Sequence, residues 1–451
     1  MSMHLLLSEI TKVINCPLPK VDAVVTGTVI DSRKVEVGDL FIALAGEHVD
    51  GHDYLTQARL AGASAALVSQ LQDDELPQLL VKDVVNAFGL IAAHWRQKCD
   101  VKVVAITGSN GKTTVKEMLA SILSQTGKVL ATQGNLNNEL GVPLTFSRLD
   151  KNDDYAVIEM GASKMGDIAS LVAIAQPDVA LINNVAPAHL EGFGDIDGVA
   201  KAKSEIFAGL VSDGIGIINT DMAYVDSWKQ VLADKKVISF ALDNDADITA
   251  QDIQLDTGSS HFMVELAEQF HYINLPLTGR HNVANALAAI SVCDALNIPA
   301  SAMEKGLAAM KGVPHRLQLR AGFNHSQIVD DTYNANPTSY KQALASLQTF
   351  SGEHWLVLGD FGELGNESKQ LHQKMGKDAK QAGIKRLFSI GESSHFAAQS
   401  FGEGAVHFED MKLLQQQLQQ ELTHEITCLI KGSRFMQLDK LADGLADGGE
   451  G

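Results

Sequence analysis

The segment that most constrains the fold of this 451-residue chain lies between residues 103 and 123. An apolar run over 103–106 has the composition of a buried strand, and apolar residues at helical spacing follow it over 115–123. The polar linker between the two runs is Thr107-Gly108-Ser109-Asn110-Gly111-Lys112-Thr113-Thr114. A strand, a glycine-rich loop ending in Lys-Thr and a helix, in this order, indicate a phosphate-binding loop on an α/β sheet.

The residue types in this loop suit a nucleoside triphosphate. Glycine lets backbone N–H groups approach phosphate oxygens, and the following helix N-terminus adds favourable partial charge. Lys112 can reach the terminal phosphates, and the Thr113 hydroxyl can bind Mg²⁺. The loop does not match the full phosphate-loop pattern G-x-x-x-x-G-K-[ST], because Ile106 occupies the position of its first glycine. The alternative to phosphate binding is an ordinary glycine-rich βα turn. We expect ATP phosphates to contact Gly108, Ser109, Asn110, Gly111, Lys112, Thr113 and Thr114.

Bulk composition excludes several classes of partner. The formal net charge is −19, which argues against nucleic acid or an anionic membrane surface as the main partner. No apolar stretch approaches the length of roughly 20 residues that a membrane span requires. The four cysteines are far apart and form no paired motif, which is typical of reduced thiols. We therefore expect a cytoplasmic protein and favour a monomer.

The spacing of strand-like and helix-like segments predicts three domains. Residues 1–85 form a small α/β unit, residues 86–313 carry the phosphate loop, and residues 314–451 form a second open α/β unit with a Rossmann-like layout. Pro314 marks a plausible hinge. Strands alternate with helices in the middle domain, which indicates a mostly parallel sheet. The strands are expected at 103–107, 155–160, 178–183, 215–219 and 236–240, and the helices at 113–126, 166–175, 198–210 and 281–296.

Two other regions complete this prediction. Residues 247–278 break the alternation and read as a small β-rich excursion. In the last domain, strands are expected near 327–330, 354–359, 385–390 and 427–431, with helices between them. No G-x-G-x-x-G follows a strand there, so a dinucleotide is not indicated. In the first domain we expect strands near 28–30, 40–44 and 65–68, and a helix near 53–61.

Functional residues of an open α/β sheet lie at the carboxyl ends of its strands. Glu159 ends one predicted strand and can bind Mg²⁺, with a solvated loop acid as the alternative. His189 follows the next strand, although imidazole is an unusual ligand for Mg²⁺. Lys201 and Lys203 lie two residues apart on a predicted helix, so they cannot both face one site. Asn282 could contact a base or cap its helix.

Further polar residues follow the same rule. An amide-rich loop contains Asn135, Asn137 and Asn138, which can cap turns or hydrogen-bond an amide-rich substrate. In the last domain, Arg316 supplies positive charge. Asp331 belongs to a polar loop after a strand, where its carboxylate could hold ribose hydroxyls.

Together these motifs resemble the Mur ligase family, which includes the related folylpolyglutamate synthetases. The phosphate loop has the form that this family uses, and Asp31-Ser32-Arg33-Lys34 resembles its domain for the substrate nucleotide. Several other segments resemble the members that add D-alanyl-D-alanine. These segments are residues 135–143, 186–194, 330–336 and 359–365.

The resemblance implies a fold, a reaction and a set of roles. It implies a central ATPase domain between a UDP-sugar domain and a domain for the incoming amine. It also implies ATP-dependent joining of D-alanyl-D-alanine to UDP-N-acetylmuramoyl-tripeptide through an acyl phosphate, in peptidoglycan synthesis. Thr113, Glu159, His189 and Lys203 would serve two Mg²⁺ ions, with Lys203 carbamylated. Lys112, His189 and Lys203 would be catalytic. Asn282, Arg316 and Asp331 would contact ATP. Ser32 and Arg33 would meet uridine diphosphate, and Asn135, Asn137 and Asn138 the substrate.

Three alternatives stay open at this point. One is another Mur ligase that adds an amino acid, although the D-N-P-R sequence of the diaminopimelate-adding members is absent. Another is a folylpolyglutamate synthetase, which would leave the segment around Ser32 and Arg33 unexplained. The third is a non-catalytic ATP-binding switch, which would have no use for Glu159, His189 and Lys203 together.

Overall fold

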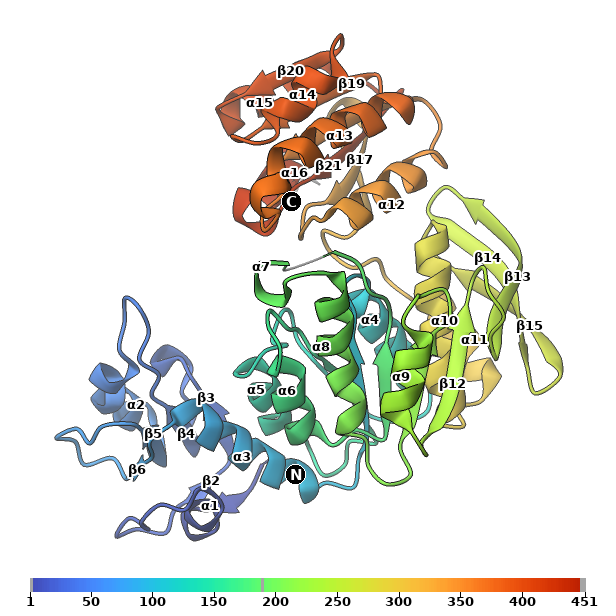
Figure 1. The fold of residues 1–451 in the computed structure, drawn as a ribbon. Helices are drawn as coiled ribbons and strands as arrows, with labels where there is room; N and C mark the ends of the chain where they lie inside the picture. Colours follow the sequence, from blue (N-terminus) through green and yellow to red (C-terminus); the bar gives the residue numbers. More distant parts are fainter. Residues whose placement is uncertain (1–2, 188–189, 447–451) are drawn as a thin grey trace.

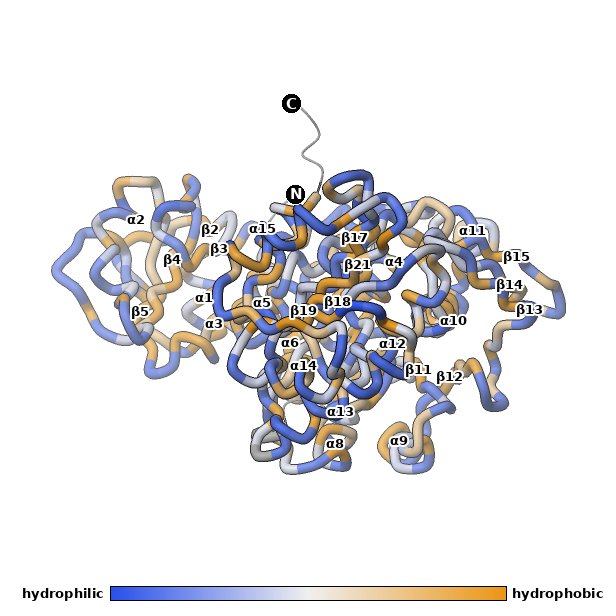
Figure 2. Tube along the Cα trace, turned by 90° about the horizontal axis from the view of Figure 1, so that it is seen from above, coloured by the Kyte–Doolittle hydropathy of each residue, from blue (hydrophilic) through white to orange (hydrophobic). Residues whose placement is uncertain are grey.

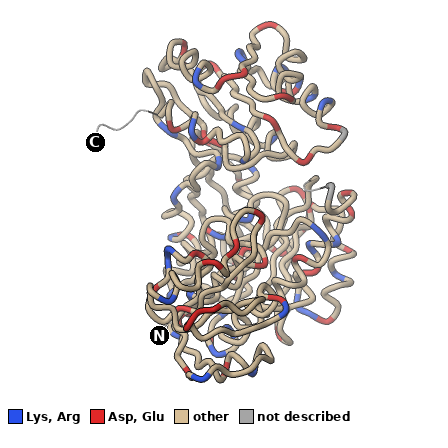
Figure 3. Tube along the Cα trace, turned by 90° about the vertical axis from the view of Figure 1, so that its left-hand side faces the viewer, with Lys and Arg blue, Asp and Glu red and all other residues tan. Residues whose placement is uncertain are grey.

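The computed structural model describes residues 3–187 and 190–446. It contains three lobes that follow one another along the chain, with the central lobe between the other two (Figure 1). Hydrophobic segments run through the strands, and hydrophilic segments occupy the outer turns (Figure 2). Acidic and basic residues are interspersed along the chain trace (Figure 3). Among the described residues, no helix combines the length and apolar character needed to cross a membrane.

The first lobe is built on a four-stranded parallel sheet in the order β3-β4-β5-β6. Alternate residues of its strands face opposite sides, as the period of a strand requires. Leu40 and Leu67 join the large core that continues into the central lobe, whereas Phe41 and Ala66 pack in a small separate core. The elements are β1 (Leu5–Leu6), α1 (Leu7–Ile14), β2 (Val24–Val25), β3 (Gly27–Val29), β4 (Asp39–Ile42), α2 (Leu55–Ala61), β5 (Ala65–Val68), β6 (Gln78–Leu80) and α3 (Val84–Gln97).

The central lobe contains a nine-stranded sheet in the order β15-β14-β13-β12-β11-β10-β7-β9-β8. The strands from β8 to β13 are parallel, and β13, β14 and β15 form the predicted β-rich excursion as an antiparallel meander. The strands are β7 (Lys102–Thr107), β8 (Val129–Ala131), β9 (Tyr155–Glu159), β10 (Val179–Ile182), β11 (Ile215–Asn219), β12 (Lys236–Ala241), β13 (Ile248–Asp256), β14 (Ser259–Leu266) and β15 (Gln269–Leu275).

Helices cover both faces of this sheet. Val103 and Ala105 of β7 face one core, and Val104 and Ile106 face the other. The helices are α4 (Lys112–Leu123), α5 (Gly141–Ser147), α6 (Asp167–Ala175), α7 (Leu190–Phe193), α8 (Ile196–Ala208), α9 (Val225–Leu232), α10 (Arg280–Ala295) and α11 (Ala300–Ala308). Parallel strands buried on both faces are nearly continuous apolar runs, which is why the sequence predicts them well.

The third lobe is a six-stranded sheet in the order β16-β17-β21-β18-β19-β20, parallel except for β16. Its two faces carry separate cores. The mixed α/β class and the second open sheet are as predicted. The elements are β16 (Gln318–Ala321), β17 (Gln327–Asp331), α12 (Pro337–Leu347), β18 (Glu353–Gly359), α13 (Ser368–Gln381), β19 (Arg386–Ile390), α14 (His395–Phe401), β20 (Ala405–Phe408), α15 (Met411–Glu421), β21 (Ile426–Lys431) and α16 (Asp439–Leu445).

Candidate active site

A cleft of about 1630 Å³ lies where the central and third lobes meet. The central lobe contributes the phosphate loop and the carboxyl ends of several parallel strands, and the third lobe contributes Arg316, Leu317, residues between 331 and 349, and Lys431. Ser32 and Arg33 do not line the cleft. His189 lies outside the described residues. The other predicted site residues all line it: residues 108–114, Asn135, Asn137, Asn138, Glu159, Lys203, Asn282, Arg316 and Asp331.

The phosphate loop ends in the exposed N-terminus of a helix. Gly111 is the N-cap of α4, with a φ of 77°, and no side chain caps the first turn. A Cβ at Gly111 would lie 2.3 Å from the Asn285 Oδ1 atom, so a larger residue would displace that side chain. The uncapped N–H groups at the start of α4 form the kind of site that binds anions.

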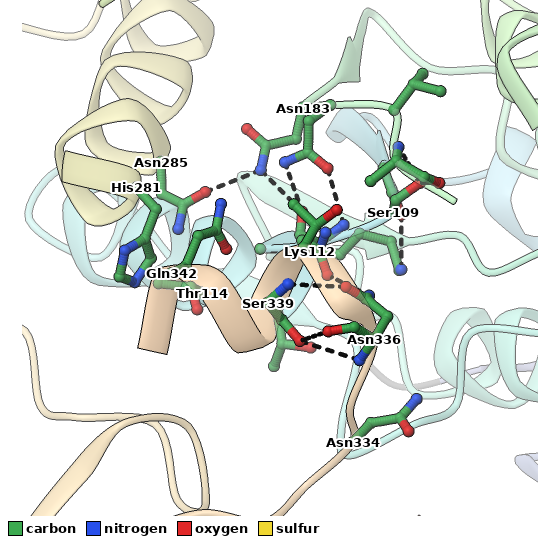
Figure 4. Close-up of a pocket in the computed structure, with 18 of the residues that line it drawn as sticks. Ser109, Lys112, Thr114, Asn183, His281, Asn285, Asn334, Asn336, Ser339 and Gln342 are labelled. Atoms are coloured by element: carbon green, nitrogen blue, oxygen red, sulfur yellow. Dashed lines mark hydrogen bonds between the residues drawn. The ribbon is translucent and has the colours of Figure 1, made fainter. Parts of the chain in front are cut away.

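Side-chain amides hold the loop in place (Figure 4). The backbone N–H of Asn110 donates to the Asn184 Oδ1 atom at 2.9 Å. The Asn183 amide donates to the Asn110 carbonyl at 3.0 Å and to the Asn285 Oδ1 atom at 2.8 Å. Asn183 follows β10, and Asn285 lies on α10. These bonds therefore fix the loop to the sheet and to the helix beside it.

Lys112 lies within the loop and folds back onto it. Its Nζ atom donates to the Gly108 carbonyl at 2.8 Å. Burial lowers the pKa of Lys112, an effect that the Glu159 charge opposes and the nearby Arg316 charge reinforces. A short move of this side chain would bring its ammonium to a phosphate bound over the loop.

Glu159 is a buried carboxylate at the end of β9, with 2% of its surface exposed. The Thr113 hydroxyl donates to Oε2 at 2.9 Å, and the Asn137 amide donates to Oε1 at 2.8 Å. Both donors are neutral, and within 3–187 and 190–446 no Lys or Arg forms an ion pair with Glu159. A buried carboxylate costs free energy without a cation. Glu159, Thr113 and Asn137 offer the oxygen ligands that Mg²⁺ prefers, so they fit that ion.

Described residues include no group of three or more His, Cys, Asp or Glu side chains placed to hold a metal. Of the predicted metal ligands that are described, Lys203 is the least conventional. Lys203 is 4% exposed, whereas Lys201 is exposed, so the two lysines lie on different faces of α8 as predicted. Burial, reinforced by the charge of Lys112, lowers the pKa of Lys203 well below its usual range. Burial therefore favours the neutral form of this amine, which is a nucleophile.

Two contacts join the third lobe to the phosphate loop. The Arg316 guanidinium donates to the Thr113 Oγ1 atom at 3.0 Å and lies 4.1 Å from the centre of the Tyr333 ring. The Asn336 amide donates to the Asn110 Oδ1 atom at 2.7 Å. Asn336 also caps α12, which follows it. These contacts connect residues more than 200 positions apart and close the cleft on one side.

Asp331 and Asn282 are already engaged in hydrogen bonds. The Asp331 carboxylate pairs with the buried Lys431 ammonium at 2.5 Å. The Asn282 amide donates to the Thr278 carbonyl at 2.9 Å and its Oδ1 atom accepts from Asn285 at 3.2 Å. A nucleotide contact by either side chain would therefore add to, or replace, a bond within the protein.

His281 lies in the first turn of α10, on the wall of the cleft. Burial lowers its pKa to about 4, an effect that the Asp331 charge opposes and the Lys431 charge reinforces. The side chain is therefore neutral at pH 7.

We expect the melting temperature to fall as pH decreases from 6.5, the ordinary His pKa, towards 4. In this range the unfolded chain binds a proton at His281 that the native state does not bind, so stability falls with pH. The limiting slope is about 1.4 kcal/mol per pH unit. Thermal melts of wild type and the His281→Gln variant over this pH range measure the contribution of His281, because the other groups titrate alike in both proteins. Parallel pH profiles of the two proteins would contradict the assignment.

Ser32 and Arg33 lie in the first lobe, at the carboxyl end of β3. The Arg33 guanidinium forms two hydrogen bonds with Asp31, at 2.9 and 2.8 Å, and lowers the Asp31 pKa to about 2. The Ser32 hydroxyl donates to the Gln57 Oε1 atom at 3.0 Å. Their predicted contact with uridine diphosphate stays a prediction.

The predicted site residues did not include Asn183, His281, Asn285, Asn336 and Lys431, which also line the cleft. Asn285 lies one helical turn after Asn282, a spacing that could have indicated it. Asn183 is the last residue of a predicted strand, where the strand-end rule applies. Lys431 ends a predicted strand, so the same rule applies to it. His281 and Asn336 carry no comparable local signal, because their places in the cleft depend on contacts between lobes.

Comparison with known proteins identifies the family. Residues 24–98, 106–293 and 315–434 match the models for the Mur ligase family catalytic domain, the Mur ligase middle domain and the Mur ligase glutamate ligase domain. The chain is 44% identical to the UDP-N-acetylmuramoyl-tripeptide–D-alanyl-D-alanine ligase of Escherichia coli strain K12, over 98% of each protein. The chain belongs to the Mur ligase family.

Solved structures of Mur ligases agree with this identification. A crystal structure of MurF from Acinetobacter baumannii is 34% identical, covers 98% of each chain and gives a TM-score of 0.91. MurF ligase from Thermotoga maritima, solved in complex with ADP, is 28% identical. It covers 93% of this chain and 96% of its own, with a TM-score of 0.82. The three-lobe architecture is therefore that of the Mur ligases.

Proposed function

We propose that this Mur ligase joins D-alanyl-D-alanine to UDP-N-acetylmuramoyl-tripeptide, with cleavage of ATP to ADP and phosphate. One observation carries the proposal. The cleft combines a phosphate loop, a buried carboxylate that pairs with no Lys or Arg in the described part of the chain, and cationic or amide groups from the neighbouring lobe. A nucleotide-binding switch would not require all three. The names of relatives that are 34–44% identical support the choice of substrates.

The proposed reaction has two steps. A carboxylate oxygen of the tripeptide attacks the γ-phosphorus of ATP, and the bond from that phosphorus to the β,γ-bridging oxygen breaks to release ADP. The neutral amine of D-alanyl-D-alanine then attacks the acyl carbon, loses a proton and expels inorganic phosphate. Negative charges meet in the first step, so catalysis requires their screening. We assign this screening to Lys112, Arg316 and the N–H groups at the start of α4.

We propose that Glu159 and Thr113, with His189 and Lys203, hold the Mg²⁺ ions of the reaction. A bound divalent ion would supply positive charge beside the phosphates. The buried, neutral amine of Lys203 supports its predicted carbamylation. It would attack CO₂ through nitrogen, lose a proton and become a carbamate, which offers the oxygen ligands that an amine lacks. The carbamate would also place a negative charge next to Lys112, in place of an amine whose charged form the Lys112 charge disfavours.

We propose that each predicted domain binds one substrate: residues 1–85 bind the UDP-sugar, residues 86–313 bind ATP and residues 314–451 bind the incoming dipeptide. The first boundary falls within α3 (Val84–Gln97), which packs in the core common to the first two lobes. Asn135, Asn137 and Asn138 line the cleft beside Glu159, where the reacting end of the tripeptide would lie. We further propose a monomeric enzyme that works in the cytosol; light scattering during size-exclusion chromatography tests the first point.

An acyl phosphate hydrolyses in water, so the lobes should close over it. We expect small-angle scattering to give a smaller radius of gyration when an ATP analogue and the UDP-tripeptide are both bound. Each ligand alone provides the control. An unchanged scattering profile with both ligands present would contradict closure.

The proposed function is tested by ADP release with each substrate omitted in turn. We expect ADP release to require both UDP-N-acetylmuramoyl-tripeptide and D-alanyl-D-alanine, with the joined product detected by mass spectrometry. D-alanine or L-lysine in place of the dipeptide should give no product. ATP turnover that is indifferent to both substrates would favour a switch instead, and product formed with a single amino acid would favour another member of the family.

A further inference from the structure

Lys116 is a buried lysine on the helix that follows the phosphate loop. It is 2% exposed and lies one turn after Lys112, on the same face of α4. Its Nζ atom donates to the Thr132 carbonyl at 2.8 Å and lies 2.6 Å from the Glu117 carboxylate. Burying the long, charged side chain of a lysine is costly. The proposed reaction gives this residue no direct role.

Thr132 connects Lys116 to the metal-binding carboxylate. It is 1% exposed and follows β8, the edge strand of the nine-stranded sheet. Its backbone N–H donates to the Val157 carbonyl at 3.0 Å, and its hydroxyl accepts the Glu159 N–H at 3.0 Å. Thr132 thus extends the ladder between β8 and β9 by one residue and fixes the backbone of Glu159.

These contacts close a ring around the metal-binding pair. Lys116 and Thr113 belong to α4, Thr132 follows β8 and Glu159 ends β9. The bonds Lys116–Thr132, Thr132–Glu159 and Thr113–Glu159 join the three elements at 2.8, 3.0 and 2.9 Å. Because Thr113 and Glu159 come from different elements, their separation depends on how α4 sits against the sheet edge. Lys116 provides a charged bond across that junction.

We infer that Lys116, acting through Thr132, is a positioning residue that sets the distance between Thr113 and Glu159 and hence the affinity of this pair for a divalent cation. This inference rests on the proposed function. Outer groups that orient metal ligands typically change metal affinity by about 10- to 100-fold when they are removed. Lys116 differs from such groups in acting on a helix and a strand end rather than on the ligand side chain itself.

The test measures metal binding directly, with Mn²⁺ as the probe. Electron paramagnetic resonance follows the loss of free Mn²⁺ as it is titrated into full-length protein saturated with ADP. We expect Lys116→Met to weaken Mn²⁺ binding on the order of 10-fold and to raise the half-saturating Mg²⁺ concentration for turnover similarly. Thr132→Val removes only the hydroxyl and should shift both quantities in the same direction. Thr132→Ser restores that hydroxyl and should recover most of the affinity.

A matched control separates positioning from stability. The Lys235 Nζ atom donates to the Val211 and Ser212 carbonyls at 2.7 and 2.8 Å, at the opposite end of the sheet. Lys235→Met therefore loses bonds of the same kind and should leave Mn²⁺ affinity unchanged. Equal Mn²⁺ affinity in wild type, Lys116→Met and Thr132→Val would overturn the inference, as would an equal loss in Lys235→Met. Wild-type turnover without any divalent cation would instead overturn the proposed function.

Discussion

Replacing Lys112 with methionine should lower kcat on the order of 1,000-fold, because the variant lacks a positive charge proposed to screen the transferred phosphoryl group. Methionine keeps much of the apolar stem and removes the ammonium. The interaction that the folded protein itself loses is one hydrogen bond, from Nζ to the Gly108 carbonyl. The measurement is ADP release at saturating concentrations of all three substrates.

The fold should survive this substitution. A single hydrogen bond to a loop carbonyl is worth about 1 kcal/mol, and burial already disfavours the charged form of Lys112. We therefore expect a melting temperature close to that of wild type and an unchanged circular dichroism spectrum. Activity within about tenfold of wild type would contradict the role of Lys112 in charge screening.

Replacing Lys203 with alanine should lower turnover by about 100-fold or more, because the substitution removes the group proposed to carry a metal-binding carbamate. The shortened side chain leaves space that a small carboxylic acid can enter. We expect formate or acetate to restore part of the activity, since either supplies the missing carboxylate oxygens. Turnover measured against formate concentration gives the size of the rescue.

Lys201 provides the matched control for this experiment. It lies on the same helix two residues away and is exposed, so Lys201→Ala should retain wild-type turnover and show no response to formate. Labelling wild-type protein with ¹³C-bicarbonate should give a carbamate signal in the NMR spectrum that Lys203→Ala lacks. Wild-type protein without that signal, together with a variant that formate does not rescue, would contradict carbamylation.

The phosphate loop could be predicted from sequence because its determinants are local. A strand, Gly111 at a helix N-cap and the following apolar helix face all lie within about one βα unit, and the structure has them at 102–123. Glu159 could be predicted for a similar reason. It ends an apolar strand of five residues, and parallel strands of one sheet bring their carboxyl ends to the same edge.

The remaining contacts of the site depend on how the lobes meet. Asn336 bonds to Asn110 across 226 positions, and Arg316 bonds to Thr113 across 203. No periodicity in the sequence encodes such a pairing. The lowered pKa of His281 likewise depends on burial by segments from two lobes. Lys203 was chosen through the family resemblance, and its spacing from Lys201 established only that the two lysines face different directions.

The secondary structure that could be predicted is likewise the part that local sequence determines. The parallel strands that were predicted agree with the structure to within two residues, because each is mostly apolar. The short edge strands β6, β8 and β20 were not predicted. Helices α9 (Val225–Leu232) and α11 (Ala300–Ala308) are among the elements that were not predicted. Both are short, and their polar positions leave a weak periodic signal until the sheet and the neighbouring helices cover the apolar side.

The lobes that flank the cleft have separate hydrophobic cores, one pair in the central lobe and one pair in the third. Each half can therefore stay folded while the few polar contacts between them, such as Asn336 to Asn110, break and re-form. Mild concentrations of urea should consequently inactivate this protein before they melt any secondary structure. A compound that binds both lobes at once would keep them together in urea. It would inhibit the enzyme by preventing movement between the lobes rather than by mimicking any one substrate.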